Sequence, residues 1–316
     1  MMLAGSRCST TPLRIRLCLC LLPWVGACGS TAEARDPVEA TSLMGRPLMR
    51  VEPPEETLEQ LQENLAMARA RWKSAPSEEA AVWVGRRLGY LGRYQESIEW
   101  FTRRLQEYPQ SFRLRRHRGH RFLSLRNFER AAVDLTRAWA LCSHLPDEIE
   151  QDGAPNEKGI PRSTLQTNIL YHLGLAAYLQ GHFDDAAGTF TDCLELCTND
   201  DMAVATRNWL YHALRRAGRA TEADAVLSPV VPVMDVIENF TYHRLLLVYK
   251  GHLAASEVLG QAADGVQDAT ASYGVANWYW VEGRRAPAEV MLGEVVADTP
   301  WNAFGHIAAE ADLVRR

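Results

Sequence analysis

The chain has 316 residues, of which 47% are hydrophobic and 23% are charged. This composition excludes a disordered chain, a collagen-like chain and a miniprotein dense in disulfides. The net charge of −5 comes from 34 basic and 39 acidic residues, so the chain as a whole is not a polycation that would seek nucleic acid.

The first residues have the pattern of an export signal. Residues 1–16 contain three arginines and no acidic residue, and residues 17–27 are apolar throughout. A basic start, a short apolar stretch and small residues at its end are typical of a secretory signal peptide. The apolar stretch has 11 residues, whereas a membrane-spanning helix needs about 20. We therefore predict that residues 1–28 are a signal peptide.

The end of this signal, Val25-Gly26-Ala27-Cys28, resembles the lipobox of bacterial lipoproteins. The resemblance implies that Cys28 carries a lipid, becomes the mature N-terminus and tethers the protein to the cell envelope. Gly29 after the cysteine favours the periplasmic side of the outer membrane, as in the lipoproteins of enteric bacteria. Plain secretion with cleavage nearby is the alternative.

Cleavage changes both the charge and the cysteine count. The signal contains three arginines and no acidic residue, so its removal takes the net charge from −5 to −8. Four of the seven cysteines then remain. If Cys28 carries a lipid, at most two of the other three can pair in an oxidising compartment. Whether Cys142, Cys193 and Cys197 form a disulfide stays open.

Two further segments precede the main body. Residues 29–54 contain four prolines, many small residues and no apolar period, which predicts a flexible linker. Residues 55–77 carry apolar residues at helical spacing, among them Leu58, Leu61 and Leu65. This pattern predicts an amphipathic helix that caps the front of the body.

The body is repetitive with a period of 34 residues. Gly85 aligns with Gly119, and Phe101 aligns with Leu135. Each copy has apolar residues three and four apart, a short break at Gly-x-aromatic, and a second helical run. Small residues let two helices approach closely, and large residues fill the space between them. One such hairpin cannot bury its apolar face alone, so neighbouring copies must stack.

The period and its Gly, aromatic, Ala and Pro landmarks resemble the tetratricopeptide repeat. The resemblance implies an all-α fold, an α-solenoid of stacked antiparallel helix pairs that forms a tetratricopeptide-like superhelix. Repeats 1–2 are expected at 78–141, an insertion loop at 142–163, repeats 3–6 with degenerate middle copies at 164–300, and a C-terminal capping helix at 301–316.

The same resemblance implies that the protein binds another protein along a concave face, which the first helix of each pair lines. Arginines beside aromatic residues suit a peptide groove, because arginine grips carboxylates and aromatic rings supply apolar area. Carried over copy by copy, the partner-binding candidates are Arg86, Tyr90, Arg113, Arg116, His120, Tyr171, Tyr178, Asn208, His212, Arg215, Tyr273, Asn277 and Trp280.

One stretch of the body is strongly basic. Residues 103–130 contain nine arginines against Glu107 and Glu129. Export argues against nucleic acid, so an acidic partner, an anionic lipid head group or a cell-wall polymer are the candidates. The insertion contains acidic residues of its own, among them Asp147, Glu148, Glu150 and Asp152. It is therefore an alternative occupant, which would cover the arginines in the free protein.

The residue patterns that would indicate an enzyme or a metal site are weak in this sequence. Cys193 and Cys197 lie four apart on one predicted helix, a spacing that a metal could use. No histidine follows on the same face, so we interpret both as structural thiols. His117 and His120 lie among arginines, which disfavours a cation site. The sequence has no glycine-rich phosphate loop and no Gly-x-Ser-x-Gly elbow. We therefore predict no enzyme, no cofactor and no metal site.

Two functions are consistent with these patterns. The first is a non-catalytic protein–protein interaction scaffold or adaptor, tethered to the bacterial cell envelope, whose partner is another envelope protein or peptide segment, with acidic ones among the candidates. The alternative is a lipoprotein that binds a small ligand or cell-wall glycan through the aromatic cluster of Trp278, Tyr279 and Trp280.

Overall fold

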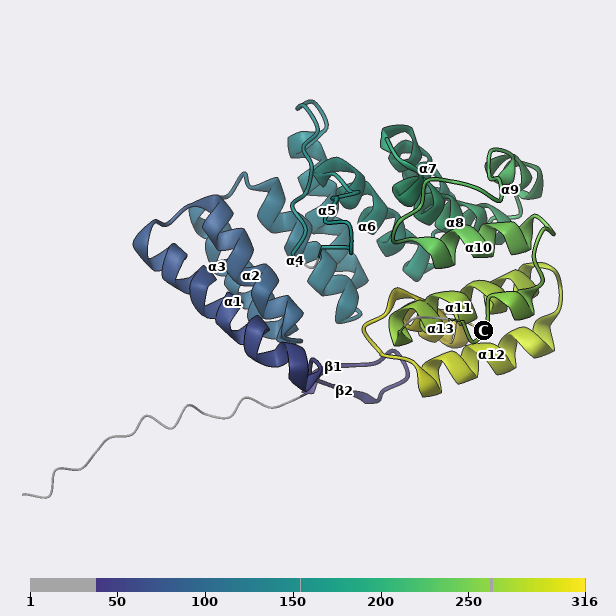
Figure 1. Cartoon of the computed structure of the whole chain (residues 1–316), viewed down its shortest axis with the longest axis horizontal. Coiled ribbons are helices and arrows are strands. Elements are labelled where there is room, and N and C mark those ends of the chain that lie inside the picture. The colour runs from purple at the N-terminus through teal and green to yellow at the C-terminus, as the bar shows by residue number, and fades with distance from the viewer. Residues whose placement is uncertain (1–37, 154, 262–263, 316) are drawn as a thin grey trace, which may run out of the picture. The chain divides into compact units, whose positions relative to one another are not determined.

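The computed structural model describes residues 38–153, 155–261 and 264–315. This part of the chain contains thirteen α-helices and one two-stranded hairpin (Figure 1). The predicted signal peptide and Cys28 lie outside the described residues. The elements are β1 Val38–Thr41, β2 Pro47–Met49, α1 Glu55–Ser74, α2 Glu78–Tyr90, α3 Tyr94–Glu107, α4 Phe112–Ser124, α5 Phe128–Cys142, α6 Leu165–Gln180, α7 Phe183–Leu196, α8 Asp200–Arg216, α9 Ala220–Leu227, α10 Phe240–Tyr249, the 3₁₀ turn η1 Ala255–Glu257, α11 Gly265–Val281, α12 Arg285–Asp298 and α13 Phe304–Val314.

Consecutive helices pack as pairs, and neighbouring pairs stack on one another (Figure 1). The pairs are α2 with α3, α4 with α5, α6 with α7, α8 with α9, and α11 with α12. The predicted all-α solenoid of stacked helix pairs is therefore confirmed. The fourth pair is short, and α10 is followed by η1 instead of a second α-helix. Within the described residues, no helix has both the length and the apolar character that a membrane crossing requires.

The two helices of a pair begin in different ways. Each first helix has a side-chain cap: Ser77, Ser111, Thr164, Asn199 and Asp264 accept hydrogen bonds from backbone N–H groups in the first turn of α2, α4, α6, α8 and α11. Such caps satisfy donors that the helix itself leaves unpaired. The second helices lack a side-chain cap and follow a tight turn.

That tight turn explains the repeated glycine of the Gly-x-aromatic break. The turn residue has a positive φ at Gly92, Gly181, Gly218 and Gly283, with values between 68° and 83°. Only glycine adopts this conformation without a steric cost. In the second copy the position belongs to Arg126, at φ 64°. The side chain of Arg126 forms a buried ion pair with Glu310.

The segment expected to be a flexible linker differs in its described part. β1 and β2 pair antiparallel, and both Glu39 and Leu48 are buried. The Glu39 carboxylate accepts hydrogen bonds from Arg50 Nε, at 3.0 Å, and from the backbone N–H of Gln95, at 2.9 Å. Gln95 lies in the first turn of α3, where a carboxylate also complements the helix dipole. The prolines and small residues of this segment could not indicate the contact between Glu39 and Gln95, because the two residues lie 56 positions apart in the sequence.

The last helix packs deeper than a terminal cap would. α13 contacts α11 and α12, and it also contacts α6 of the third pair. Before α13, Trp301 Nε1 donates to the Met49 carbonyl oxygen at 2.7 Å, and Asn302 Nδ2 donates to the Tyr94 hydroxyl at 2.9 Å. The C-terminal residues thereby join the end of the array to its beginning. The inner sides of α6, α8 and α11 are buried as a result.

Close helix pairing at the small residues has a measurable consequence. A Cβ atom at Gly85 would lie 2.1 Å from the ring of Phe101, which is buried and cannot swing away. We expect Gly85→Ala to lower the free energy of unfolding by about 1–3 kcal/mol through overpacking.

Gly188, in the exposed middle of α7, has no atom within 4 Å of the position that a Cβ atom would take. Gly188→Ala should instead stabilise the protein by about 1 kcal/mol. Urea unfolding measures the change in the free energy of unfolding for both variants. A change of the same sign in the two variants would contradict the packing argument.

Candidate functional site

The candidate site lies on α2 and α4, where the insertion between α5 and α6 folds over them. We call residues 143–163 the acidic segment. Arg86 Nη1 donates to the Gln151 carbonyl oxygen at 2.7 Å, and Arg87 Nη1 donates to the Gly153 carbonyl oxygen at 3.1 Å. On α4, Arg113 pairs with Glu148 and Arg116 pairs with Glu150. The acidic segment therefore occupies these arginines, which is the alternative that its composition had left open.

The pair of Arg116 and Glu150 is the buried part of this contact. Their side chains are 6% and 8% exposed, and Arg116 Nε lies 3.0 Å from Glu150 Oε2. Asn168 Nδ2 donates to the same oxygen at 3.1 Å. Burial lowers the pKa of Arg116, and the Glu150 carboxylate opposes that shift. A buried charge pair of this kind holds only while both partners remain.

Two histidines complete the wall of the site on α4. Burial, followed by the charges of neighbouring arginines, lowers the pKa of His117 and of His120 well below the usual value. Both imidazoles are therefore uncharged at neutral pH. Because Arg116 Nη1 can only donate, its 3.2 Å contact to His120 Nδ1 makes that nitrogen an acceptor. The proton of His120 then resides on Nε2.

Two cavities adjoin the acidic segment. The smaller, of about 100 Å³, lies between α2 and α4 and is lined by Arg86, Arg116, Arg121 and Glu150, among others. The larger, of about 350 Å³, is lined by apolar residues such as Trp83 together with charged ones. The two cavities are adjacent, because they share the lining residues Arg86, His117 and Glu150. The smaller one is lined by three arginines and one glutamate, whereas the lining of the larger one contains four glutamates and two arginines.

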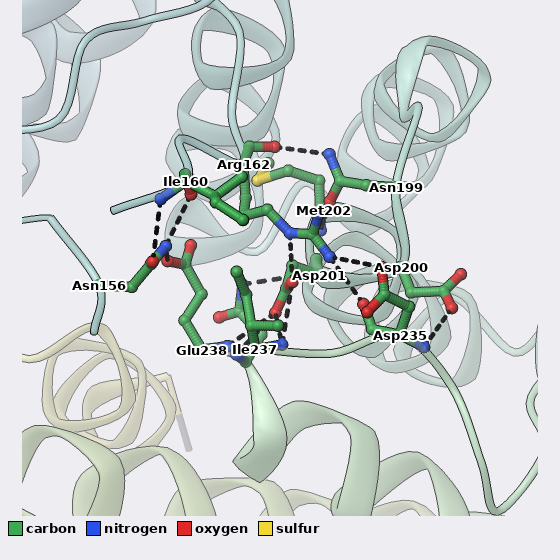
Figure 2. A network of polar contacts seen from close by, with 11 residues as sticks. Asn156, Ile160, Arg162, Asn199, Asp200, Asp201, Met202, Asp235, Ile237 and Glu238 are labelled. Carbon is green, nitrogen blue, oxygen red and sulfur yellow. Dashed lines mark hydrogen bonds and ion pairs between the residues drawn. The ribbon is translucent and has the colours of Figure 1, made fainter. Parts of the chain in front are cut away.

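Both ends of the acidic segment are anchored to the rest of the chain. At its start, the Asp147 carboxylate accepts from the backbone N–H of Gln166 at 3.1 Å, and Glu150 N–H donates to the Ser163 carbonyl oxygen at 3.0 Å. At its end, Arg162 Nε donates to the Asp201 carboxylate at 2.7 Å (Figure 2).

The Asp201 carboxylate is the centre of that second anchor (Figure 2). It is fully buried and accepts from three successive backbone N–H groups, those of Ile237, Glu238 and Asn239, at 3.0–3.1 Å. Asp201 thus joins the acidic segment, α8 and the connection before α10. Burial alone would raise the pKa of Asp201, but the hydrogen bonds from Arg162 and the three amides outweigh it and lower the pKa.

This anchor predicts a pH-dependent stability. Because the folded pKa of Asp201 is below the unfolded value of about 3.9, its contribution is present above that value and is lost as pH falls through the folded pKa. We expect Asp201→Asn to cost about 2–3 kcal/mol at pH 7, since it removes hydrogen bonds to a charged acceptor. The difference in stability from the wild type should vanish as pH falls below about 3.9 in a series of urea-unfolding measurements.

The control is Asp235→Asn, at an exposed partner of Arg162, which should change stability by less than about 0.5 kcal/mol. A pH-independent deficit would contradict the assignment.

Five of the predicted partner-binding residues come together at this site. Arg86 and Tyr90 lie on α2, and Arg113, Arg116 and His120 lie on α4. Arg86 Nη2 donates to the Tyr90 hydroxyl at 3.0 Å, and its guanidinium lies over the ring of Trp83, 4.5 Å from the ring centre. All five retain exposed surface except Arg116, which the acidic segment covers.

The remaining predictions differ from the structure, because the inner side of the later repeats is filled. Arg215 is paired with Glu282, and the half-buried Trp280 has the guanidinium of Arg285 over its ring at 3.9 Å. The other six have exposed fractions between 0% and 8% and bond to groups of the chain itself; they are Tyr171, Tyr178, Asn208, His212, Tyr273 and Asn277. They have no surface to offer a partner in this structure.

Helix α13 contributes to this burial at Tyr178 and Tyr273. The Tyr178 and Tyr273 hydroxyls are 2.7 Å apart, and Tyr273 donates to the Asp312 carboxylate of α13 at 3.1 Å. Asp312 also accepts from both terminal nitrogens of Arg216, at 3.1 and 2.9 Å. The helical period placed these residues on the inner side, but it does not report what covers that side.

One lining residue escaped the sequence analysis. Arg121 of α4 lines the smaller cavity, whereas the repeat resemblance selected Arg113, Arg116 and His120. Arg121 stands 34 residues after Arg87, and neither of these equivalent positions was among the candidates. The period therefore gave no signal for Arg121.

The aromatic cluster proposed for glycan binding is covered by arginines. Arg284 lies over the Tyr279 ring at 3.8 Å, and Arg285 covers one face of Trp280. The rings of Trp278 and Tyr249 pack against each other at 6.5 Å. Faces that would stack on a sugar are therefore occupied by the chain itself.

The three cysteines of the described residues are free thiols. Burial raises the pKa of Cys142 to about 11, so it is an unreactive thiol at neutral pH. Cys193 is buried and its Sγ lies 3.4 Å from the Thr167 carbonyl oxygen. Within residues 38–153, 155–261 and 264–315, no three His, Cys, Asp or Glu side chains gather in a way that would hold a metal ion.

Comparison with known proteins gives structural likeness alone. No protein-family model matches the sequence, and no curated protein matches it. One similar structure is a putative kinesin light chain of Podosopora anserina with nearly identical TPR-like repeats, at 13% identity and a TM-score of 0.39, covering 77% of this chain and 96% of that one. Another is the APC/C hetero-tetramer Cut9-Hcn1, at 11% identity and a TM-score of 0.33, covering 77% of this chain and 57% of that one. The chain thus spans less than two thirds of the second protein, and neither likeness bears on function.

Proposed function

We propose that the protein is a non-catalytic interaction scaffold or adaptor that binds an acidic, extended segment of another protein on α2 and α4. The observation that carries this proposal is the acidic segment itself. The site already holds a stretch of chain through two backbone carbonyls and two carboxylates. Recognition of carbonyls is independent of side-chain identity, and recognition of carboxylates selects acidic sequences. A partner of the same chemistry fits the same donors.

The strength of the internal contacts supports exchange with a partner. Arg113 and Glu148 have side chains that are 29% and 56% exposed, and pairs of this kind contribute about 0–1 kcal/mol. Arg86 holds its carbonyl partner at the surface. Only the pair of Arg116 and Glu150 is fully buried. A partner carboxylate therefore displaces the outer contacts first, while the anchors at Asp147 and Asp201 keep the segment attached.

Charge reversal tests this function. Arg113→Glu combined with Arg116→Glu should remove the binding of acidic partners in a pull-down from envelope extract. The matched control is Arg103→Glu combined with Arg137→Glu, because both residues are exposed arginines of the neighbouring helices α3 and α5 and lie outside both cavities. Circular dichroism confirms that each double variant is folded. If the α4 variant retains every partner that the control retains, the surface is wrong.

We also propose that this body is tethered to the bacterial cell envelope through a lipid on Cys28. The support is the sequence pattern of a basic start, a short apolar stretch and Val25-Gly26-Ala27-Cys28. Mass spectrometry of the mature protein should find a lipid-modified cysteine at its N-terminus, and Cys28→Ser should move the protein from the membrane fraction to the soluble fraction. An unmodified N-terminus beyond Cys28 would overturn the tether and leave the binding site untouched.

A further inference from the structure

The smaller cavity between α2 and α4 has an unusual charge composition. Its charged lining consists of the guanidinium groups of Arg86, Arg116 and Arg121 and a single carboxylate, that of Glu150. Glu150 is already engaged by Arg116 and Asn168. The two histidines of the lining are uncharged, because burial and the arginines lower the pKa of each. Three cations against one anion leave two positive charges without a counter-charge in the cavity.

Arg121 is the least compensated of these cations. Among the described residues, its side chain forms no hydrogen bond and no ion pair, and its guanidinium lies over the Tyr94 ring, 4.9 Å from the centre. Burial lowers its pKa, and no carboxylate opposes that shift. A buried guanidinium carries a desolvation cost that an anionic partner would offset.

The wall beside Arg121 is shaped to keep this space open. Gly89 of α2 faces the guanidinium, and a Cβ atom there would lie 3.0 Å from Arg121 Nη1. Any side chain at position 89 would therefore press on the group that points into the cavity. Gly89 lies one turn from Gly85, which makes room for the ring of Phe101. The lack of a side chain at Gly89 instead leaves the N–H donors of the Arg121 guanidinium accessible.

We propose that this cavity binds a phosphate dianion, either free or as the terminal group of a monoester, with Arg86, Arg116 and Arg121 as its cationic donors. A dianion matches the two uncompensated charges, whereas a carboxylate would leave one. Guanidinium groups present paired N–H donors that fit the oxygens of phosphate. The cavity volume of about 100 Å³ suits one small tetrahedral anion, and the Nε2–H of the uncharged His120 is a further donor on its wall.

This site goes beyond the proposed scaffold function and does not depend on it. The partner surface also uses Arg113 and Arg87, and neither lines the smaller cavity. The two sites share Arg86, Arg116 and Glu150. Bound phosphate competes with Glu150 for Arg116, so occupancy would loosen the acidic segment at its buried contact.

Calorimetric titration of the full chain with inorganic phosphate tests the site at constant ionic strength and pH 7.5. We expect saturable binding of one phosphate per chain, at least tenfold tighter than that of acetate. Glycerol phosphate, titrated in parallel, identifies the source: tighter binding than phosphate points to an ester, and weaker binding points to the free ion. Absence of saturable binding by both would overturn the proposal.

Variants assign the binding to the cavity. Arg121→Gln should weaken phosphate binding at least tenfold, whereas Arg103→Gln, an exposed arginine on α3, should leave it unchanged. Glu150→Gln should tighten it, because a competing carboxylate is removed. Equal affinity of Arg121→Gln and wild type would exclude this cavity.

Two further measurements keep these results interpretable. Thermal unfolding with and without phosphate shows whether each variant is folded, and Arg121→Lys, which keeps the charge, should fall between wild type and Arg121→Gln. Arg113→Gln should leave phosphate affinity within twofold of wild type while weakening partner binding. Failure of the phosphate site and failure of the scaffold function therefore give different results.

Discussion

Replacing Asp312 with alanine should lower the free energy of unfolding by about 3–5 kcal/mol, which is the cost of leaving a buried charge without its partner. The Asp312 side chain is 1% exposed, and that of Arg216 is 10% exposed. Asp312 accepts from Arg216, Arg315 and the Tyr273 hydroxyl, so its carboxylate joins α13 to α8 and α11. Burial alone would lower the pKa of Arg216, but Asp312 and nearby hydroxyls outweigh it and raise the pKa. The truncation removes that compensation and leaves two guanidiniums facing each other.

Urea unfolding followed by circular dichroism measures the loss. Asp192→Ala is the matched control, because Asp192 is an exposed aspartate in the middle of α7, and its replacement should change stability by less than about 0.5 kcal/mol. A loss below about 1 kcal/mol for Asp312→Ala would mean that the Asp312 carboxylate contributes little to holding α13 in place. Limited proteolysis adds a local readout, since a loosened α13 exposes its backbone to cleavage.

The position of α13 marks the limit of what the 34-residue period can predict. The period selected Tyr178, Tyr273 and Asn277 for the inner side of the first helices, and all three are buried in the structure. Whether that side is open depends on contacts between residues far apart in sequence, such as Arg216 and Asp312, which are 96 residues apart. Periodicity reports only which face of a helix is apolar or small. It contains no information on a partner that arrives from a distant part of the same chain.

Charge patterning shows the same limit at the acidic segment. The basic stretch and the acidic residues of the insertion were both visible in the sequence, and both an internal and an external occupant were consistent with them. The choice required the geometry of Glu150, which reaches Arg116 because Asp147 and Arg162 anchor the segment at its two ends. Sequence patterns predict structure better where the interactions are between residues that are close in the sequence. The side-chain caps and the turn glycines follow directly from residue type.

Arg126 is the exception among those turn residues, and its removal should be the second large effect. Its side chain is 3% exposed, and Nε donates to Glu310 Oε2 at 2.8 Å. Glu310 on α13 is 2% exposed, and His306 Nε2 lies 3.8 Å from its Oε1. Arg126→Met keeps most of the side-chain volume and the backbone conformation but leaves Glu310 without its cation. We expect a loss of about 3–5 kcal/mol at pH 7.

The pH dependence of this loss separates a buried charge from a packing defect. In the wild-type protein, burial would raise the pKa of Glu310, but His306 and Arg126 outweigh it and lower the pKa. Its stabilising contribution is therefore present above the unfolded value of about 4.3 and is lost as pH falls through the folded pKa. In Arg126→Met the hydrogen bond from His306 remains, but the charge and the hydrogen bond of Arg126 are lost, so the folded pKa of Glu310 is higher than in the wild type. Protonation then relieves the variant, so its deficit should shrink steadily as pH falls from 7 to 4.

A double variant tests whether the side chains of Arg126 and Glu310 are coupled. Arg126→Met combined with Glu310→Leu replaces both charges by apolar groups, which in buried ion pairs costs far less than removing one partner. We expect the double variant to recover at least half of the stability that Arg126→Met loses, with a deficit independent of pH between 4 and 7. Chemical denaturation of the four proteins of this cycle measures the coupling between the two side chains. If the double variant is as unstable as the sum of the single ones, the pair is not coupled.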